Sequence, residues 1–204
     1  MSGQIETLYR LQKKDILKAT AVAAAAFQSE PFWNAIVGDK TEQLAGAYEA
    51  PLRYCFTYGD VYAPSEAVEG IAAWVSSDFA DMTPWRLLRS GSLVAGFKVG
   101  MGNMLRMLPV FGAMDADRIK NMKGKSYFHF QIFCVAPELQ GRGLGGKMLR
   151  ALIEKSEQAG VYIYLETQTE ENVRMYEKFG FEVVLKHVMP KVNLPVWDMV
   201  RKPA

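Results

Sequence analysis

Cysteine is scarce in this chain, which has two cysteines among 204 residues. Cys55 and Cys134 lie far apart and form no pair at the spacing of metal ligands. The sequence therefore predicts no metal site. Sparse, unpatterned cysteine is typical of a reduced compartment, and we expect the protein to be cytoplasmic.

The net charge is also small, and the sequence has no long uninterrupted apolar run. A formal charge of +2 gives no indication of a nucleic-acid partner, although it is compatible with a phosphate-rich ligand, because local geometry decides such binding. The most apolar stretch, 91–114, is interrupted by Lys98, Arg106, several glycines and Pro109, so it does not make a membrane span of about 20 apolar residues. The first residues lack the basic and apolar segments of a signal peptide. We expect no membrane partner.

Apolar residues, by contrast, make up half of the chain, which is enough to bury a core. The length suits one domain, 1–204, with a sizeable insertion. Hydrophobic periodicity predicts helices at about 15–27, with Asp15 as N-cap, at 31–37, from Asp39 or Thr41 through Phe56, at 143–158 and at 171–178. Strands are predicted at about 8–12, 61–63, 70–75, 127–135, 161–166, 181–189 and 194–201. This order predicts an α+β fold around one sheet.

The segment 76–126 differs from the rest and is the predicted insertion. It holds six of the eleven methionines, together with Trp85, Phe97 and Phe111, and indicates two or three helices broken by glycines. Two interpretations stay open. In the first, the segment forms an apolar lid over a site or lines a pocket for a substrate. In the second, it is a group of helices packed on the sheet or at a contact between two copies of the chain.

A glycine-rich loop, 141–147 (GRGLGGK), fits several phosphate-binding patterns, because glycines let backbone N–H groups approach phosphate oxygens. A P-loop requires Ser or Thr where this chain has Met148. A dinucleotide-binding fingerprint would use Gly141, Gly143 and Gly146, with Glu166 as its acidic residue. Its glycine turn should follow the strand directly, but residues 136–140 intervene here. Only 38 residues remain after Glu166, too few for the further strand–helix–strand units of such a domain. Alternatively, residues 141–147 are a glycine-rich connection that binds no ligand.

The third pattern is Gln140-x-x-Gly143-x-Gly145, and its surroundings strengthen it. Upstream stands 130–140 (FQIFCVAPELQ), and downstream stand 165–167 (LET) and 172–181 (NVRMYEKFGF). Together these segments resemble the GCN5-related N-acetyltransferase (GNAT) superfamily over about residues 127–201. The closing 196–201 (VWDMVR) is similar to the last strand of a puromycin-acetyltransferase-like branch.

The resemblance implies a GNAT fold. Its central sheet is mixed but mostly antiparallel, with about 6–7 strands flanked by helices, and a V-shaped splay separates the strands at 127–135 and 161–166. Acetyl-CoA would lie in the splay, with its pantetheine arm paired to the backbone of Phe133 and Val135 and its pyrophosphate on the loop amides. The implied cofactor-binding residues are Phe133, Cys134, Val135, Gln140, Gly141, Arg142, Gly143, Leu144, Gly145, Gly146, Lys147, Asn172 and Tyr176.

The reaction would be attack of an unprotonated amine on a thioester carbonyl. By resemblance, Tyr176 is the general acid near the sulfur, and the backbone N–H near Val135 stabilises the oxyanion. Asn172, one turn before Tyr176, would hydrogen-bond the cofactor, unless it serves only as a cap or first-turn residue.

The general base is left open by the sequence. Strand alternation is expected to place Tyr127, His129, Gln131 and Phe133 on one face. His129 is a candidate, because the intrinsic pKa of a histidine side chain suits a general base. Glu166, Glu30 and a chain of water molecules are the alternatives.

The sequence thus indicates an acetyl-CoA-dependent N-acetyltransferase that acetylates a primary amine of a small molecule by direct attack in a ternary complex. The alternatives are a protein or peptide N-acetyltransferase and a non-catalytic acyl-CoA-binding domain. A homodimer is compatible with the sequence but not required by it.

Overall fold

The computed structural model describes residues 3–37, 41–189 and 192–204, and its centre is a sheet of strand order β1-β2-β3-β4-β5-β7-β6. The strands are β1 (Tyr9–Arg10), β2 (Gly59–Ala63), β3 (Gly70–Ser76), β4 (Tyr127–Val135), β5 (Tyr162–Thr167), β6 (Glu182–Val188) and β7 (Pro195–Arg201). Neighbouring strands are antiparallel except β4 and β5, which are parallel. The predicted α+β fold with a mostly antiparallel, seven-stranded sheet is confirmed.

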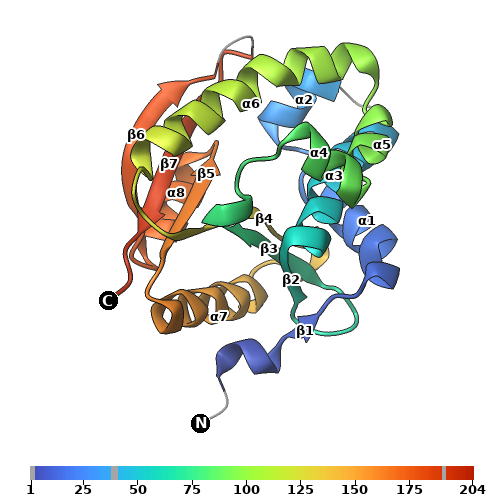
Figure 1. Ribbon diagram of the computed structural model, residues 1–204. Helices are drawn as coiled ribbons and strands as arrows, with labels where there is room; N and C mark the ends of the chain where they lie inside the picture. Colours follow the sequence, from blue (N-terminus) through green and yellow to red (C-terminus); the bar gives the residue numbers. More distant parts are fainter. Residues whose placement is uncertain (1–2, 38–40, 190–191) are drawn as a thin grey trace.

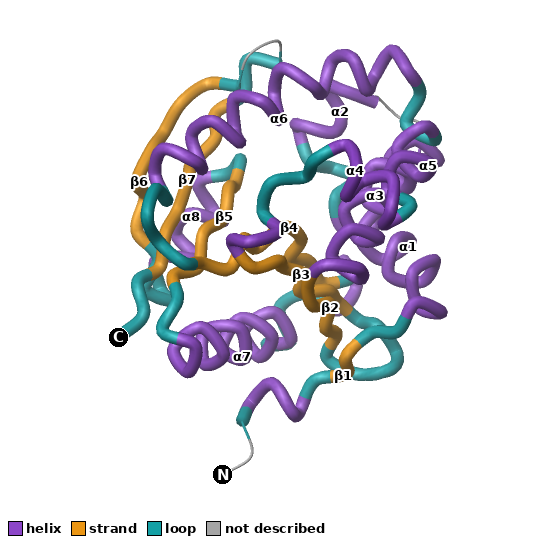
Figure 2. Tube along the Cα trace, viewed as in Figure 1, coloured by secondary structure: helices purple, strands orange, loops and turns teal. Residues whose placement is uncertain are grey.

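Helices cover both faces of this sheet. They are α1 (Ile16–Ala26), α2 (Pro31–Val37), α3 (Thr41–Tyr58), α4 (Pro84–Ser90), α5 (Ser92–Phe97), α6 (Met101–Asn121), α7 (Leu144–Ala159) and α8 (Glu170–Glu177). Short 3-10 turns lie at Gln4–Thr7, Lys13–Asp15, Ser77–Phe79 and Pro137–Leu139. In Figure 1, α6 crosses above the sheet while α7 lies below it, and α1 to α5 gather at one end. The same view coloured by element is Figure 2.

Each face of the sheet has its own apolar core, which explains the unbroken apolar run of β3. Ile71, Ala73 and Val75 belong to a cluster with α1, α3 and α6, whereas Ala72 and Trp74 belong to a second cluster with α7 and α8. Successive side chains of a strand point to opposite faces, so a strand that is covered on both sides is apolar throughout.

The sheet splays between β4 and β5, as the resemblance predicted. The two strands pair only over 127–129 and 162–164. Beyond these residues β4 continues beside β3, and β5 continues beside β7. The open wedge between them begins where this short parallel ladder ends.

A β-bulge at Gln131 corrects the predicted alternation along β4. Ala73 lies opposite Ile132 and Trp74 lies opposite Phe130, so Gln131 is the extra residue. The bulge reverses the faces after residue 131. His129 and Tyr127 therefore lie on the α6 face, whereas Phe133 packs with Phe130 on the α7 face.

Several boundaries also differ from those expected. The first strand is shorter than predicted, because only Tyr9 and Arg10 pair with β2. Asp15 occupies the N-cap position of α1, but its carboxylate accepts from Gln12 N (2.8 Å) and Tyr9 Oη (3.0 Å) and does not cap α1. Helix α3 begins at Thr41, and Asp39 lies outside the described residues.

The segment 76–126 contains three α-helices, α4 to α6, between β3 and β4. Two of its glycines separate these helices, since Gly91 (φ 76°) stands between α4 and α5 and Gly100 (φ 90°) precedes α6, whereas Gly96, Gly102 and Gly112 lie inside helices and break none. A left-handed φ of this kind favours glycine. Within the described ranges, no helix has the length and apolar character needed to cross a membrane.

Candidate active site

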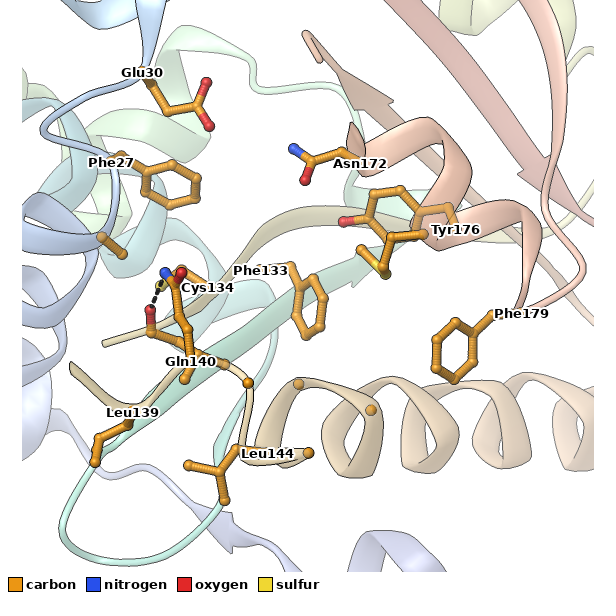
Figure 3. A pocket seen from close by; sticks show the side chains of 17 residues that line it. Phe27, Glu30, Phe133, Cys134, Leu139, Gln140, Leu144, Asn172, Tyr176 and Phe179 are labelled. Carbon is orange, nitrogen blue, oxygen red and sulfur yellow. Dashed lines mark hydrogen bonds between the residues drawn. The ribbon is translucent and has the colours of Figure 1, made fainter. Parts of the chain in front are cut away.

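A cavity of about 390 Å³ lies at the open end of β4. Its walls come from the glycine loop, the end of β4, α8 and the segment that follows α1 (Figure 3). The lining residues are Ala26, Phe27, Glu30, Phe133, Cys134, Val135, Leu139, Gln140, Gly141, Gly143, Leu144, Gly145, Gly146, Asn172, Met175, Tyr176 and Phe179.

The glycine loop offers a row of backbone N–H groups to this cavity. The first amide that donates within α7 is that of Lys147, to Gly143 O (3.0 Å), and no acceptor is found among the described residues for the amides of 141–146. Gly141 (φ 75°) and Gly143 (φ 80°) are left-handed, and a Cβ at either would meet nothing within 4 Å. These glycines are therefore needed for backbone conformation. Unpaired amides at the start of a helix bind phosphate oxygens well.

The end of β4 presents unpaired backbone groups on the splayed side. Ala136 N donates to Glu69 O (2.8 Å), which lies on the β3 side. Because successive amides of a strand alternate in direction, the N–H groups of Phe133 and Val135 point into the splay. Gln140 Nε2 donates to Val135 O at 3.1 Å, the contact drawn in Figure 3, and so fixes the loop to the strand.

Helix α8 positions Tyr176 and Asn172. The Thr169 hydroxyl caps this helix by accepting from Asn172 N at 3.2 Å, so Asn172 is a first-turn residue with its side chain turned to the cavity. Tyr176 is only 7% exposed and packs against Phe133 and Phe181, with ring centroids 6.2 and 5.3 Å apart. Burial, with a smaller contribution from the Cys134 side chain, raises the pKa of Tyr176. The phenol is therefore protonated at neutral pH.

Glu30 faces these residues from the other wall. It follows α1, where its amide donates to Phe27 O (3.0 Å), and it lies across the cavity from Asn172 and Tyr176 (Figure 3). Burial raises the pKa of this half-buried carboxyl. A carboxylate with a raised pKa holds a proton more readily than an ordinary glutamate.

His129 and Glu166 are brought together, but outside the cavity lining. His129 Nε2 and Glu166 Oε2 are 3.0 Å apart, and both side chains are largely buried. Gln131 Nε2 lies 3.5 Å from His129 Nδ1. Of the three protein groups predicted as base, the cavity lining contains one, Glu30.

Two predicted cofactor ligands also lie outside the lining. Lys147 Nζ donates to Thr7 O (3.1 Å), and Arg142 Nη2 donates to Glu138 O (3.4 Å). Conversely, sequence reasoning missed five lining residues, Ala26, Phe27, Leu139, Met175 and Phe179. Met175 and Phe179 flank Tyr176 and could have been found from its motif, whereas Ala26 and Phe27 carry no motif and reach the cavity through the packing of α1.

Comparisons with known proteins agree with this geometry. Residues 109–183 match the family model of the acetyltransferase (GNAT) domain. The chain is 26% identical over 211 residues to an uncharacterized N-acetyltransferase of Schizosaccharomyces pombe, covering 95% of this chain and 82% of that protein.

Solved structures share the fold. The histone acetyltransferase HPA2 and related acetyltransferase of Corynebacterium glutamicum superposes with a TM-score of 0.67 at 15% identity, covering 100% of this chain and 98% of that one. The polyamine N-acetyltransferase of Drosophila melanogaster gives a TM-score of 0.61 at 14% identity, covering 96% and 98%. The narrower resemblance to puromycin acetyltransferases stays a prediction. The chain therefore has the GNAT fold, residues 109–183 match the GNAT acetyltransferase domain, and the chain as a whole is similar to an N-acetyltransferase.

Proposed function

We propose that this protein is an acetyl-CoA-dependent N-acetyltransferase that acetylates a primary amine of a small molecule by direct attack in a ternary complex. The observation that carries the proposal is the cavity itself, which joins the unpaired loop amides, the open edge of β4, the Tyr176 phenol and the Glu30 carboxyl. The Drosophila polyamine N-acetyltransferase, which catalyses formation of N-acetylagmatine, supports a small amine as the acceptor class.

The residues present fit acetyl-CoA. The amides of 141–146 would hold the pyrophosphate, and the backbone N–H groups of Phe133 and Val135 that point into the splay would pair with the pantetheine arm as with an added strand. When bound, acetyl-CoA supplies the electrophilic thioester carbonyl. The Val135 N–H would donate to the oxygen on which negative charge develops, and Tyr176 Oη would give its proton to the departing sulfur.

Glu30 would take the proton from the amine. It lines the same cavity as Tyr176, whereas His129 and Glu166 are paired with each other outside the lining. Its raised pKa makes it a better proton acceptor than an exposed glutamate.

Replacing Glu30 with glutamine should lower kcat/KM at neutral pH roughly tenfold to a hundredfold, because water can take over only part of the proton transfer. The deficit should shrink as the pH approaches the pKa of the amine, since more acceptor then arrives unprotonated. A pH profile of kcat/KM for Glu30→Gln checks this, with the exposed Glu138→Gln as control. A deficit that is equal at every pH would contradict the assignment.

Stability provides a second check on Glu30→Gln. A carboxyl whose pKa is raised by folding favours the folded state below its unfolded pKa, and this contribution is lost as the pH rises through the folded pKa. The ionised Glu30 carboxylate therefore destabilises the folded state at neutral pH. The variant should therefore keep or raise its Tm at pH 7, so a loss of activity would not reflect unfolding.

The acceptor class is tested by following CoA release over a panel of alkyl, aryl and polyamine substrates, with amine-terminal peptides alongside. The proposal expects turnover with one or more small amines. Turnover with peptides alone would indicate a peptide N-acetyltransferase. Tight acetyl-CoA binding without release of CoA across the panel would indicate an acyl-CoA-binding domain.

A further inference from the structure

The helices between β3 and β4 expose large apolar side chains to solvent. On α4 they are Trp85 and Leu88, on α5 Val94 and Phe97, and at the start of α6 Met101, Leu105 and Leu108. These seven residues define the α4–α6 outer face. Leu105 is 61% exposed and Leu108 62%, so neither contributes to a core of this chain. Concentrated apolar exposure of this kind marks an interaction surface.

Helical spacing shows that the exposed residues form one stripe on each helix. Met101, Leu105 and Leu108 follow an i, i+4, i+7 pattern, while Met107 and Val110 are buried on the opposite side of α6. Val94 and Phe97 are likewise three residues apart on α5. The helices lie at the periphery of the molecule, away from α7, and α5 leads directly into α6 (Figures 1 and 2).

The chain segment that carries this face has charged residues of one sign. Between Met82 and Met114 the chain has no acidic residue and four basic ones, Arg86, Arg89, Lys98 and Arg106. Lys98 pairs with Glu49 of α3 (2.6 Å), whereas Arg89 and Arg106 are exposed and have no ion-pair partner among the described residues.

Exposed acidic residues flank this stretch, Asp78 and Asp81 before it and Asp115 after it. Asp81 and Asp115 share one cation, the buried Arg118, at 2.8 and 3.0 Å. The stretch that carries the α4–α6 outer face is thus apolar and basic, with acidic residues at its two ends.

We propose that the α4–α6 outer face docks on the surface of an anionic phospholipid bilayer. Apolar stripes that carry Trp, Phe and Leu beside Arg and Lys insert into the headgroup region, and anionic lipids attract the basic residues. A second copy of this chain fits less well, because a two-fold contact would place the face of one copy, with its arginines, against the same face of the other. This contact is peripheral and involves no membrane-spanning helix, and it would replace the expectation from the sequence that the protein has no membrane partner.

Sedimentation with lipid vesicles tests the proposal. The wild-type protein should bind vesicles of phosphatidylcholine mixed with phosphatidylserine, bind phosphatidylcholine alone much more weakly, and dissociate as salt is raised. Arg89→Gln/Arg106→Gln should weaken binding to the mixed vesicles about 25-fold, at roughly fivefold per charge. Leu105→Gln/Leu108→Gln should weaken binding to both kinds of vesicle by about tenfold or more.

The matched control is Val183→Gln/Val184→Gln, which removes two exposed apolar side chains from β6, outside the face. This control should bind vesicles as the wild type does, and all variants should retain their Tm. Equal binding to both kinds of vesicle, or binding to neither, would overturn the proposal. So would a dimer in light scattering that Leu105→Gln/Leu108→Gln converts to monomer, since the face would then be a contact between two copies.

Discussion

Replacing Tyr176 with phenylalanine should lower kcat roughly 10²- to 10⁴-fold while the affinity for acetyl-CoA stays nearly unchanged. The ring would keep its packing against Phe133 and Phe181, so only the hydroxyl that faces the cavity is lost. Burial already holds the pKa of this phenol above its ordinary value, so the wild-type group carries its proton throughout the neutral range. Steady-state kinetics and a calorimetric titration of acetyl-CoA measure the two quantities separately.

Tyr62→Phe is the matched control, because Tyr62 stacks on Trp74 in the α7 core and does not line the cavity. It should leave kcat unchanged. If Tyr176→Phe also kept its kcat, Tyr176 would not be the acid. If the variant instead lost affinity and Tm together, the role of the residue would be structural.

An aspartate at Gly143 should abolish acetyl-CoA binding, with an affinity loss of roughly a hundredfold or more. Gly143 stands at the N-cap of α7 among the unpaired amides, and a Cβ there would meet nothing within 4 Å. The new carboxylate would occupy the anion position and repel the pyrophosphate. Asp is strained at a left-handed φ, but less than most residues, and a negative charge at a helix N-terminus offsets part of that strain, so the Tm should fall only modestly.

Two further variants separate charge from backbone effects. Gly143→Asn has a similar shape without the charge and should bind acetyl-CoA more tightly than Gly143→Asp. Gly160→Asp places the same residue at the left-handed C-cap of the same helix (φ 64°), also in open space. It should bind acetyl-CoA normally but lose some stability, because a negative charge at a helix C-terminus is unfavourable. Equal affinities for all three variants would exclude the loop as the anion site.

The sequence predicted those parts of the site that depend on local chemistry. The bounds of β4 and the glycine that ends α7, Gly160, follow from short segments whose residues have strong conformational preferences. The apolar run 161–166 likewise indicated a buried strand, and β5 lies inside the sheet between β4 and β7.

The parts that failed depend on partners distant in the sequence. Whether β4 carries a bulge at Gln131 is decided by its register with β3, and this single extra residue moves Phe133 to the face opposite His129. Glu30 was one of the candidate bases, but its place in the cavity depends on how α1 packs on the sheet, which no pattern around residue 30 reveals. Lys147 lies outside the cavity lining, with its Nζ bonded to Thr7 O, and its role toward the cofactor stays a prediction.

The most direct test of the central claim is a titration of acetyl-CoA into the wild-type protein, followed by calorimetry and by thermal unfolding. The cavity and its loop predict binding at a single site. They also predict a Tm increase of about 5–10 °C when acetyl-CoA is at 100 times its Kd. Absence of both a binding heat and a Tm shift in excess acetyl-CoA would contradict the assignment of this cavity as an acetyl-CoA site.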